Sequence, residues 1–159
     1  MIKSESMKPH FEIADLKDAP KLTLISIEAF HTDDTVAGRN SKGGPPGYDS
    51  IAFHEQMIQE STKFFTIKVD KKIVGGFWFN QENLENAYLY RVFLDPEFHR
   101  KGIGLQAFLF LFENFPDIKV WTLKVPTWNT RTPKFYKKLG FKIVDKSDRF
   151  LLFKRTWCK

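Results

Sequence analysis

Apolar residues along the chain follow two spacings, and each spacing predicts a different kind of element. Short runs rich in aromatic and β-branched residues, several with alternating polar positions, predict strands. Such runs occupy residues 11–13, 64–69, 73–80, 88–94, 119–125, 141–146 and 149–156. Apolar residues spaced by three or four positions predict helices over 19–30, 48–60 and 102–115.

A further short helix is expected between Thr132 and Gly140. Thr132 suits the N-cap, Pro133 suits the first turn, and glycine is a common terminator. Strands and helices therefore alternate irregularly along one chain, and no internal repeat divides it. We expect residues 1–159 to form a single α/β domain.

Residues 31–50 read as the one long loop, with four of the nine glycines and the adjacent Pro45 and Pro46. A loop of this length in a compact domain is usually functional or disordered. We interpret it as a substrate-side loop, and a plain surface loop is the alternative.

Composition fits an ordinary globular chain, with 42% apolar and 28% charged residues. The single cysteine, Cys158, excludes an internal disulfide and fits a reducing compartment. The N-terminal residues lack the apolar segment of a signal peptide, and no run is long enough to span a membrane. We expect a cytoplasmic protein without a membrane partner.

The net charge of +6 is concentrated near the C-terminus, where residues 119–159 hold twelve Lys and Arg against Asp145 and Asp148. A basic surface can attract nucleic acid or the phosphates of a cofactor, or can simply be solvated. The aromatic strands do not match the glycine-aromatic pattern of RNA-binding sheets. No nucleic-acid partner is therefore expected.

The segment 87–115 combines a strand, a basic turn and a helix that opens on Gly102 and Gly104. The first turn of a helix has unpaired N–H groups and a partial positive charge. Glycine lets an anion approach this backbone, and Arg100 and Lys101 add full charges beside it. The segment predicts a phosphate site.

Two nucleotide-binding patterns are excluded for the glycines of this chain. Residues 102–107 fit G-x-G-x-x-A, but seven residues separate them from the strand, and the next strand carries Lys124 where an acid is needed. The glycines at 38–44 lack the lysine and hydroxyl of a P-loop.

Three motifs instead resemble the GCN5-related N-acetyltransferases (GNAT superfamily), in family order and spacing. The first is VFLDP at 92–96 followed by HRKGIG at 99–104. The second is NTRTPKFYKKLGF at 129–141, and the third is the hairpin DKKIVGGF at 70–77. Together they cover roughly residues 63 to 145.

This resemblance implies a mixed sheet of six or seven strands with helices on both faces and splayed central strands. It implies acetyl-CoA as co-substrate, no metal, and direct acetyl transfer to an amine acceptor of unknown identity. A catalytically silent acyl-CoA-binding module on the same fold is the alternative, and a homodimer stays open.

The resemblance also assigns site residues. The turn and helix opening would hold the pyrophosphate of coenzyme A, the end of the central strand would pair with its pantetheine arm, and Asn129 would contact that arm. Tyr136 would protonate the departing thiolate; its alternative is a buried aromatic ring. The cofactor-binding residues are then Val92, Phe93, Leu94, His99, Arg100, Lys101, Gly102, Ile103, Gly104, Asn129 and Tyr136.

The chain departs from the family pattern at several positions. His99 replaces the usual Gln or Arg, and Thr132 replaces a small alanine. Tyr88 and Lys124 stand where relatives often carry the glutamate base. An amine acceptor of pKa about 10 must lose a proton, so a base is needed. The sequence leaves it unassigned among water chains, His31, Asp33, Asp34, Glu82 and Glu85.

Overall fold

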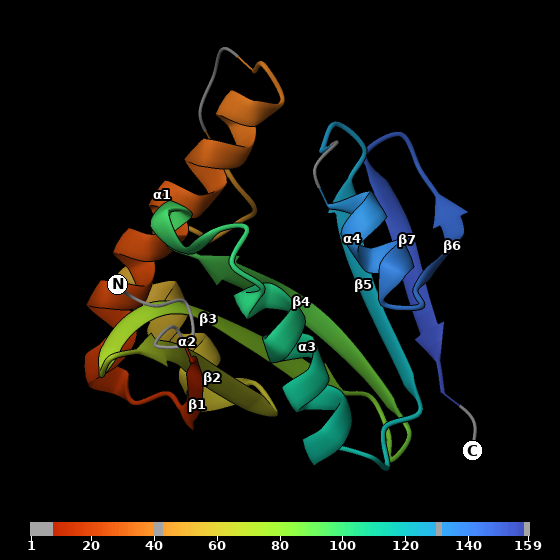
Figure 1. Ribbon diagram of the computed structural model, residues 1–159, viewed down its shortest axis with the longest axis horizontal. Coiled ribbons are helices and arrows are strands. Elements are labelled where there is room, and N and C mark those ends of the chain that lie inside the picture. The colour runs from red at the N-terminus through yellow and green to blue at the C-terminus, as the bar shows by residue number, and fades with distance from the viewer. Residues whose placement is uncertain (1–7, 40–42, 130–131, 158–159) are drawn as a thin grey trace, which may run out of the picture.

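The computed structural model describes residues 8–39, 43–129 and 132–157, which fold around one seven-stranded sheet (Figure 1). The strands are β1 (His10–Ile13), β2 (Lys63–Val69), β3 (Lys72–Gln81), β4 (Asn86–Leu94), β5 (Val120–Pro126), β6 (Lys142–Lys146) and β7 (Phe150–Thr156). The helices are α1 (Ala19–Val36), α2 (Ile51–Glu60), α3 (Ile103–Asn114) and α4 (Pro133–Lys138), with short 3-10 turns η2 (Leu16–Asp18) and η3 (Pro96–Phe98).

The sheet order is β1-β2-β3-β4-β5-β7-β6, and all neighbours are antiparallel except β4 and β5. These two parallel strands pair only at their beginnings, where Asn86, Ala87 and Tyr88 face Val120, Trp121 and Thr122. Beyond that point they diverge, as Figure 1 shows. The expected mixed sheet and its splayed central strands are confirmed.

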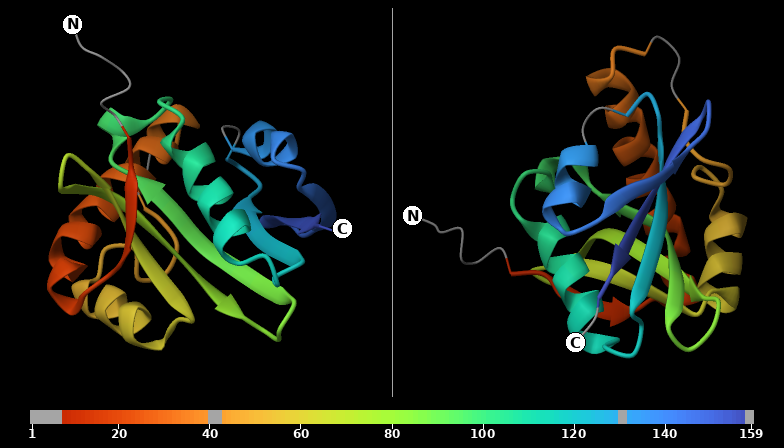
Figure 2. Two further views of the ribbon diagram at one scale, coloured as in Figure 1. Left: turned by 60° about the horizontal axis from the view of Figure 1, so that its bottom comes forward. Right: turned by 90° about the vertical axis from the view of Figure 1, so that its right-hand side faces the viewer.

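Helices cover both faces of the sheet (Figure 2). On one face α3 and α4 pack onto a core that includes Phe77, Phe108 and Trp121. On the other face α1 and α2 pack onto Trp78 and Phe93. Because successive strand residues point to opposite faces, Phe77 and Trp78 serve different cores.

A bulge interrupts the pairing of β3 with β4 just where β4 parts from β5. Trp78 pairs with Arg91 while its neighbour Phe79 pairs with Leu89, which leaves Tyr90 as the extra residue. Such a bulge bends a strand and re-aims its side chains. Here it coincides with the start of the splay.

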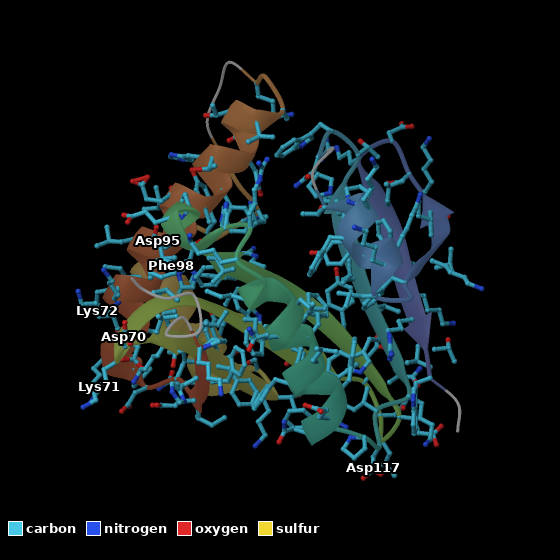
Figure 3. The ribbon with its side chains drawn as sticks, viewed as in Figure 1. Asp70, Lys71, Lys72, Asp95, Phe98 and Asp117 are labelled. Atoms are coloured by element: carbon cyan, nitrogen blue, oxygen red, sulfur yellow. The ribbon has the colours of Figure 1, made fainter. Side chains whose placement is uncertain are left out.

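The hairpin predicted around Asp70-Lys71-Lys72 is present between β2 and β3, on the left of Figure 3. Asp70 and Lys71 both have positive φ, 51° and 69°, as a type I′ turn requires. Figure 3 also places Asp95 and Phe98, in the turn between β4 and α3, beside α1, and Asp117 far away beyond the other end of α3.

Two predicted boundaries were wrong. The loop expected over 31–50 is shorter, because α1 continues through residues 31–36 to Val36. Thr32 and Thr35 hydroxyls donate to carbonyls one turn earlier, so these poor helix formers bond within the helix. Similarly, α2 begins at Ile51 rather than at 48, where the Ser50 side chain caps the Phe53 N–H.

Candidate functional site

The start of α3 leaves its backbone open, as the glycine pattern predicted. Gly102 is the N-cap with φ of 79°, and a Cβ built on it would meet no atom within 4 Å. A Cβ on Gly104 would meet only Phe135 Cζ, at 3.6 Å. Ile103, fully buried, anchors the turn, while Arg100 and Lys101 are exposed beside it. The amides of this turn can therefore be reached by an anion.

The His99 side chain forms a hydrogen bond that links the turn before α3 to the sheet. Its ring Nε2 lies 2.9 Å from the Leu94 carbonyl oxygen, so this nitrogen donates a hydrogen bond to the end of β4. The Asp95 side chain accepts from the Glu97 N–H, and the Asp95 N–H donates to the Val74 carbonyl. The turn is thus fixed to the sheet from both sides.

The last residues of β4 turn their side chains into the protein. Phe93 packs into the α1–α2 core, and Val92 and Leu94 pack against the α3–α4 core. Since β5 has already diverged, what β4 can offer on that side is its backbone. The pantetheine contact predicted for Val92, Phe93 and Leu94 would use this edge and stays a prediction.

Tyr136 lies on α4 with its ring among Phe108, Phe135, Phe141 and Phe153, at centroid distances of 5.5 to 5.9 Å. Burial raises the pKa of Tyr136, and the negative charge of Asp33 raises that pKa further. The hydroxyl therefore stays protonated and is suited to donating a hydrogen bond. Full proton transfer to a thiolate of pKa about 8.5 is less favourable than from an ordinary phenol.

The start of α4 is as predicted, with Pro133 in its first turn. Thr132 holds the N-cap position but makes no side-chain capping bond, and its hydroxyl is buried without a partner among the described residues. The Oδ1 atom of Asn129, a buried side chain, accepts from the Thr132 N–H at 3.3 Å. Asn129 is thus hydrogen-bonded to the residue at the start of α4. Gly140, with φ of 95°, follows the end of α4 as predicted.

The end of α1 approaches the β5–α4 connection across the diverging strands. Asp34 is almost fully buried, pairs with Arg39 Nε at 3.1 Å and accepts from the Gly43 N–H at 2.6 Å. Arg39 in turn stacks over the Trp128 ring at 4.3 Å. Sequence reasoning missed this contact, because nothing local links Arg39 to Trp128.

Two of the candidate bases, Asp34 and His31, contact other side chains. Asp34 is engaged with Arg39, and the His31 ring is hydrogen-bonded to the Tyr48 hydroxyl at 2.8 Å. Glu82 and Glu85 lie in the β3–β4 connection, at the end where β4 and β5 are still paired. Asp33 is the candidate base whose negative charge raises the pKa of Tyr136. Cys158 lies outside the described residues.

The site just described is that of an acyltransferase fold, and a family comparison agrees with it. The model of the acetyltransferase (GNAT) family matches residues 26–141, and the chain belongs to this family. Among curated proteins, the uncharacterised protein YrkN of Bacillus subtilis (strain 168) is 29% identical over 137 residues. The aligned region covers 84% of this chain and 73% of the YrkN chain.

Solved structures share the fold over almost the whole chain. PaiA N-acetyltransferase from Thermoplasma acidophilum, in complex with coenzyme A, aligns with a TM-score of 0.78 at 22% identity, covering 95% of this chain and 100% of its own. An acetyltransferase from Thermus thermophilus aligns with a TM-score of 0.79 at 16% identity, covering 96% of this chain and 99% of its own. The described helices include none that is long and apolar enough to cross a bilayer.

Proposed function

We propose that the protein is an acetyl-CoA-dependent N-acetyltransferase that moves an acetyl group directly from the thioester to an amine. The observation that carries this proposal is the divergence of β4 from β5 directly before the open start of α3. A free strand edge and an exposed helix start then lie consecutively along the chain, as a ligand with a pyrophosphate and an amide arm requires. The structural likeness to a coenzyme A complex, PaiA, supports the same ligand.

The residues present fit this ligand. The open space around Gly102 and Gly104 would receive the pyrophosphate, and Arg100 and Lys101 would add charge-assisted contacts. Val92, Phe93 and Leu94 would offer backbone groups to the arm. Bound acetyl-CoA supplies an activated acetyl thioester with a thiol leaving group.

Two side chains, Tyr136 and Asp33, then act on the reacting groups. The Tyr136 hydroxyl, kept protonated by its surroundings, donates a hydrogen bond where negative charge develops on the leaving sulfur. We assign Asp33 as the group that attracts the acceptor ammonium and takes its proton. This assignment rests on its position near the end of α1 and on the effect of its charge on the pKa of Tyr136.

Ligand-dependent melting tests the cofactor. At about one hundred times Kd, acetyl-CoA should stabilise the fold by about 2.7 kcal/mol and raise Tm by several degrees. Gly104→Glu, which puts a negative side chain where phosphate should lie, should abolish the rise and leave the circular dichroism spectrum unchanged. The absence of any rise for the wild type at millimolar acetyl-CoA or coenzyme A would contradict the proposal.

A silent acyl-CoA-binding module predicts the same rise in Tm but no turnover. Two observations favour this second candidate. The pKa of Tyr136 is raised, and Tyr88 and Lys124 stand at the two positions where relatives often carry glutamate. Binding without release of free thiol, for any amine tested, would favour it over the enzyme.

A further inference from the structure

Arg91 holds an unusual position at the bulge of β4. Its guanidinium carbon lies 5.0 Å from the Phe53 ring centroid and 5.2 Å from that of Trp78, so it lies against one aromatic ring of α2 and one of β3. One terminal nitrogen, Nη2, donates to the Pro46 carbonyl. The other, Nη1, is buried and has no hydrogen-bond partner in the described part of the chain.

No carboxylate among the described residues forms an ion pair with this guanidinium. The ion pairs among the described residues are Lys17–Asp15, Arg39–Asp34 and Lys68–Glu12, and none involves Arg91. Burial accordingly lowers the pKa of Arg91 to about 10, against the opposing influence of Tyr88. Stacking on aromatic rings offsets part of the desolvation, but it leaves the Nη1 hydrogens unpaired.

A desolvated cation without a counter-ion is costly, so such a group is a candidate for binding a ligand. The Pro46 carbonyl is a neutral partner, whereas a carboxylate forms shorter and stronger bonds with both arms of a guanidinium. Pro46 belongs to the segment between α1 and α2, and the acceptor oxygen would join or replace its carbonyl.

The location fits the acceptor rather than the cofactor. Arg91 points to the α1–α2 face, whereas α3, the predicted phosphate-binding helix, lies on the opposite face. It is also three residues beyond Tyr88, the last β4 residue paired with β5, and so lies where the strands part. The rings of Tyr88 and Tyr90, 4.5 Å apart, continue the aromatic surface next to it, with Tyr90 stacked on Trp78.

We propose that Arg91 binds a carboxylate of the acceptor, so that the substrates are amines that also carry a carboxylate, as amino acids do. Resting on the proposed N-acetyltransferase function, this inference narrows the acceptor class. It excludes polyamines and other purely cationic amines as preferred acceptors.

The test measures binding of reaction products, which removes the amine and its pKa from the comparison. The probes are the N-acetyl derivatives of the twenty standard amino acids and, as partners, the corresponding N-acetyl amino acid amides, each with saturating coenzyme A. We expect at least one N-acetyl amino acid to raise Tm where its amide does not. Arg91→Gln should weaken that binding by at least about tenfold, the loss expected for a charge-assisted bond.

Arg155→Gln is the matched control, because Arg155 also stacks on a ring, 3.9 Å from the Phe112 centroid, and burial also lowers its pKa. Arg155 lies on β7, outside the proposed site, and this variant should keep the carboxylate preference. Arg91→Lys, which keeps the charge, replaces Arg91→Gln if the latter does not fold and should bind more weakly than the wild type.

Equal binding of carboxylates and amides, no binding by any N-acetyl amino acid, or a preference that survives Arg91→Gln would each overturn the proposal. Failure of the N-acetyltransferase function itself gives a different result, namely no rise in Tm with acetyl-CoA or coenzyme A alone.

Discussion

At the scale of single residues, the Tyr136 hydroxyl is the group whose removal should affect turnover most directly. Tyr136→Phe keeps the ring among its four aromatic neighbours and removes only the donor. We expect kcat to fall at least about tenfold, because general acid catalysis typically contributes about 10²–10⁴-fold, with acetyl-CoA affinity nearly unchanged. Steady-state kinetics, on a variant first shown to melt normally, provide the measurement; a kcat within about twofold of wild type would make Tyr136 a packing residue.

Asp33 and Asp34 are adjacent on α1, yet the structure predicts different consequences for their substitution. Asp34→Asn should mainly cost stability, because it breaks a buried ion pair with Arg39. Asp33→Asn should lower kcat/KM for amines by about tenfold or more, since a positioned base is lost. Comparing kcat/KM and Tm for both variants tests the assignment. If Asp33→Asn retains full kcat/KM, another group takes the proton.

At the scale of elements, the turn before α2 depends on Gly47. Its φ is 81°, and a Cβ there would lie 2.3 Å from the Phe53 ring, which itself stacks on Arg91. Gly47→Ala should destabilise the fold by about 1–3 kcal/mol, through strain and overpacking, and lower Tm by several degrees. Gly43→Ala is the control, because a Cβ on Gly43 meets nothing within 4 Å. Similar melting temperatures for both variants would contradict this reading of the turn.

The elements that could be predicted from the sequence are those with strong local signals. The strands, the glycine start of α3 and the positive φ of Gly140 all follow from residues close in sequence. The extension of α1 to Val36 could not be predicted, because Thr and Asp favour caps and turns unless nearby groups hold them in a helix.

Side-chain contacts that depend on strand register also could not be predicted from the sequence. Arg91 faces Trp78 only because a bulge at Tyr90 shifts the pairing of β4, and it meets Phe53 only after α2 packs on the sheet. Asn129 was identified from its motif, but its hydrogen bond to the Thr132 N–H could be found only from the folded loop.

At the scale of the whole molecule, His54 should make stability depend on pH. The side chain is fully buried, and its Nδ1 lies 2.9 Å from both the Ser50 carbonyl oxygen and the Thr23 hydroxyl oxygen. Because that hydroxyl donates to the Ala19 carbonyl, Nδ1 carries the hydrogen. Burial lowers the pKa of His54, opposed by the Ser50 bond and reinforced by Arg91.

The neutral His54 imidazole gains its second proton near pH 6.5 in the unfolded chain and only at lower pH in the folded chain. The free energy of unfolding should therefore be at its full value above about pH 6.5 and fall as pH drops through it. His54→Asn, which keeps a donor at the Nδ1 position, should show a smaller drop in Tm between pH 7.5 and 5.5. An identical pH dependence in both proteins would exclude His54 as the source.

The central claim is that the diverging strands, the α3 start and Tyr136 together transfer acetyl groups to amines. The direct measurement is release of free thiol from acetyl-CoA with single amines drawn from amino acids, peptides, polyamines and aminoglycosides. Mass spectrometry of the product should show an added acetyl group on the amine. We expect turnover, with amines that also carry a carboxylate the best acceptors. Binding of acetyl-CoA without amine-dependent thiol release across the whole panel would contradict the account.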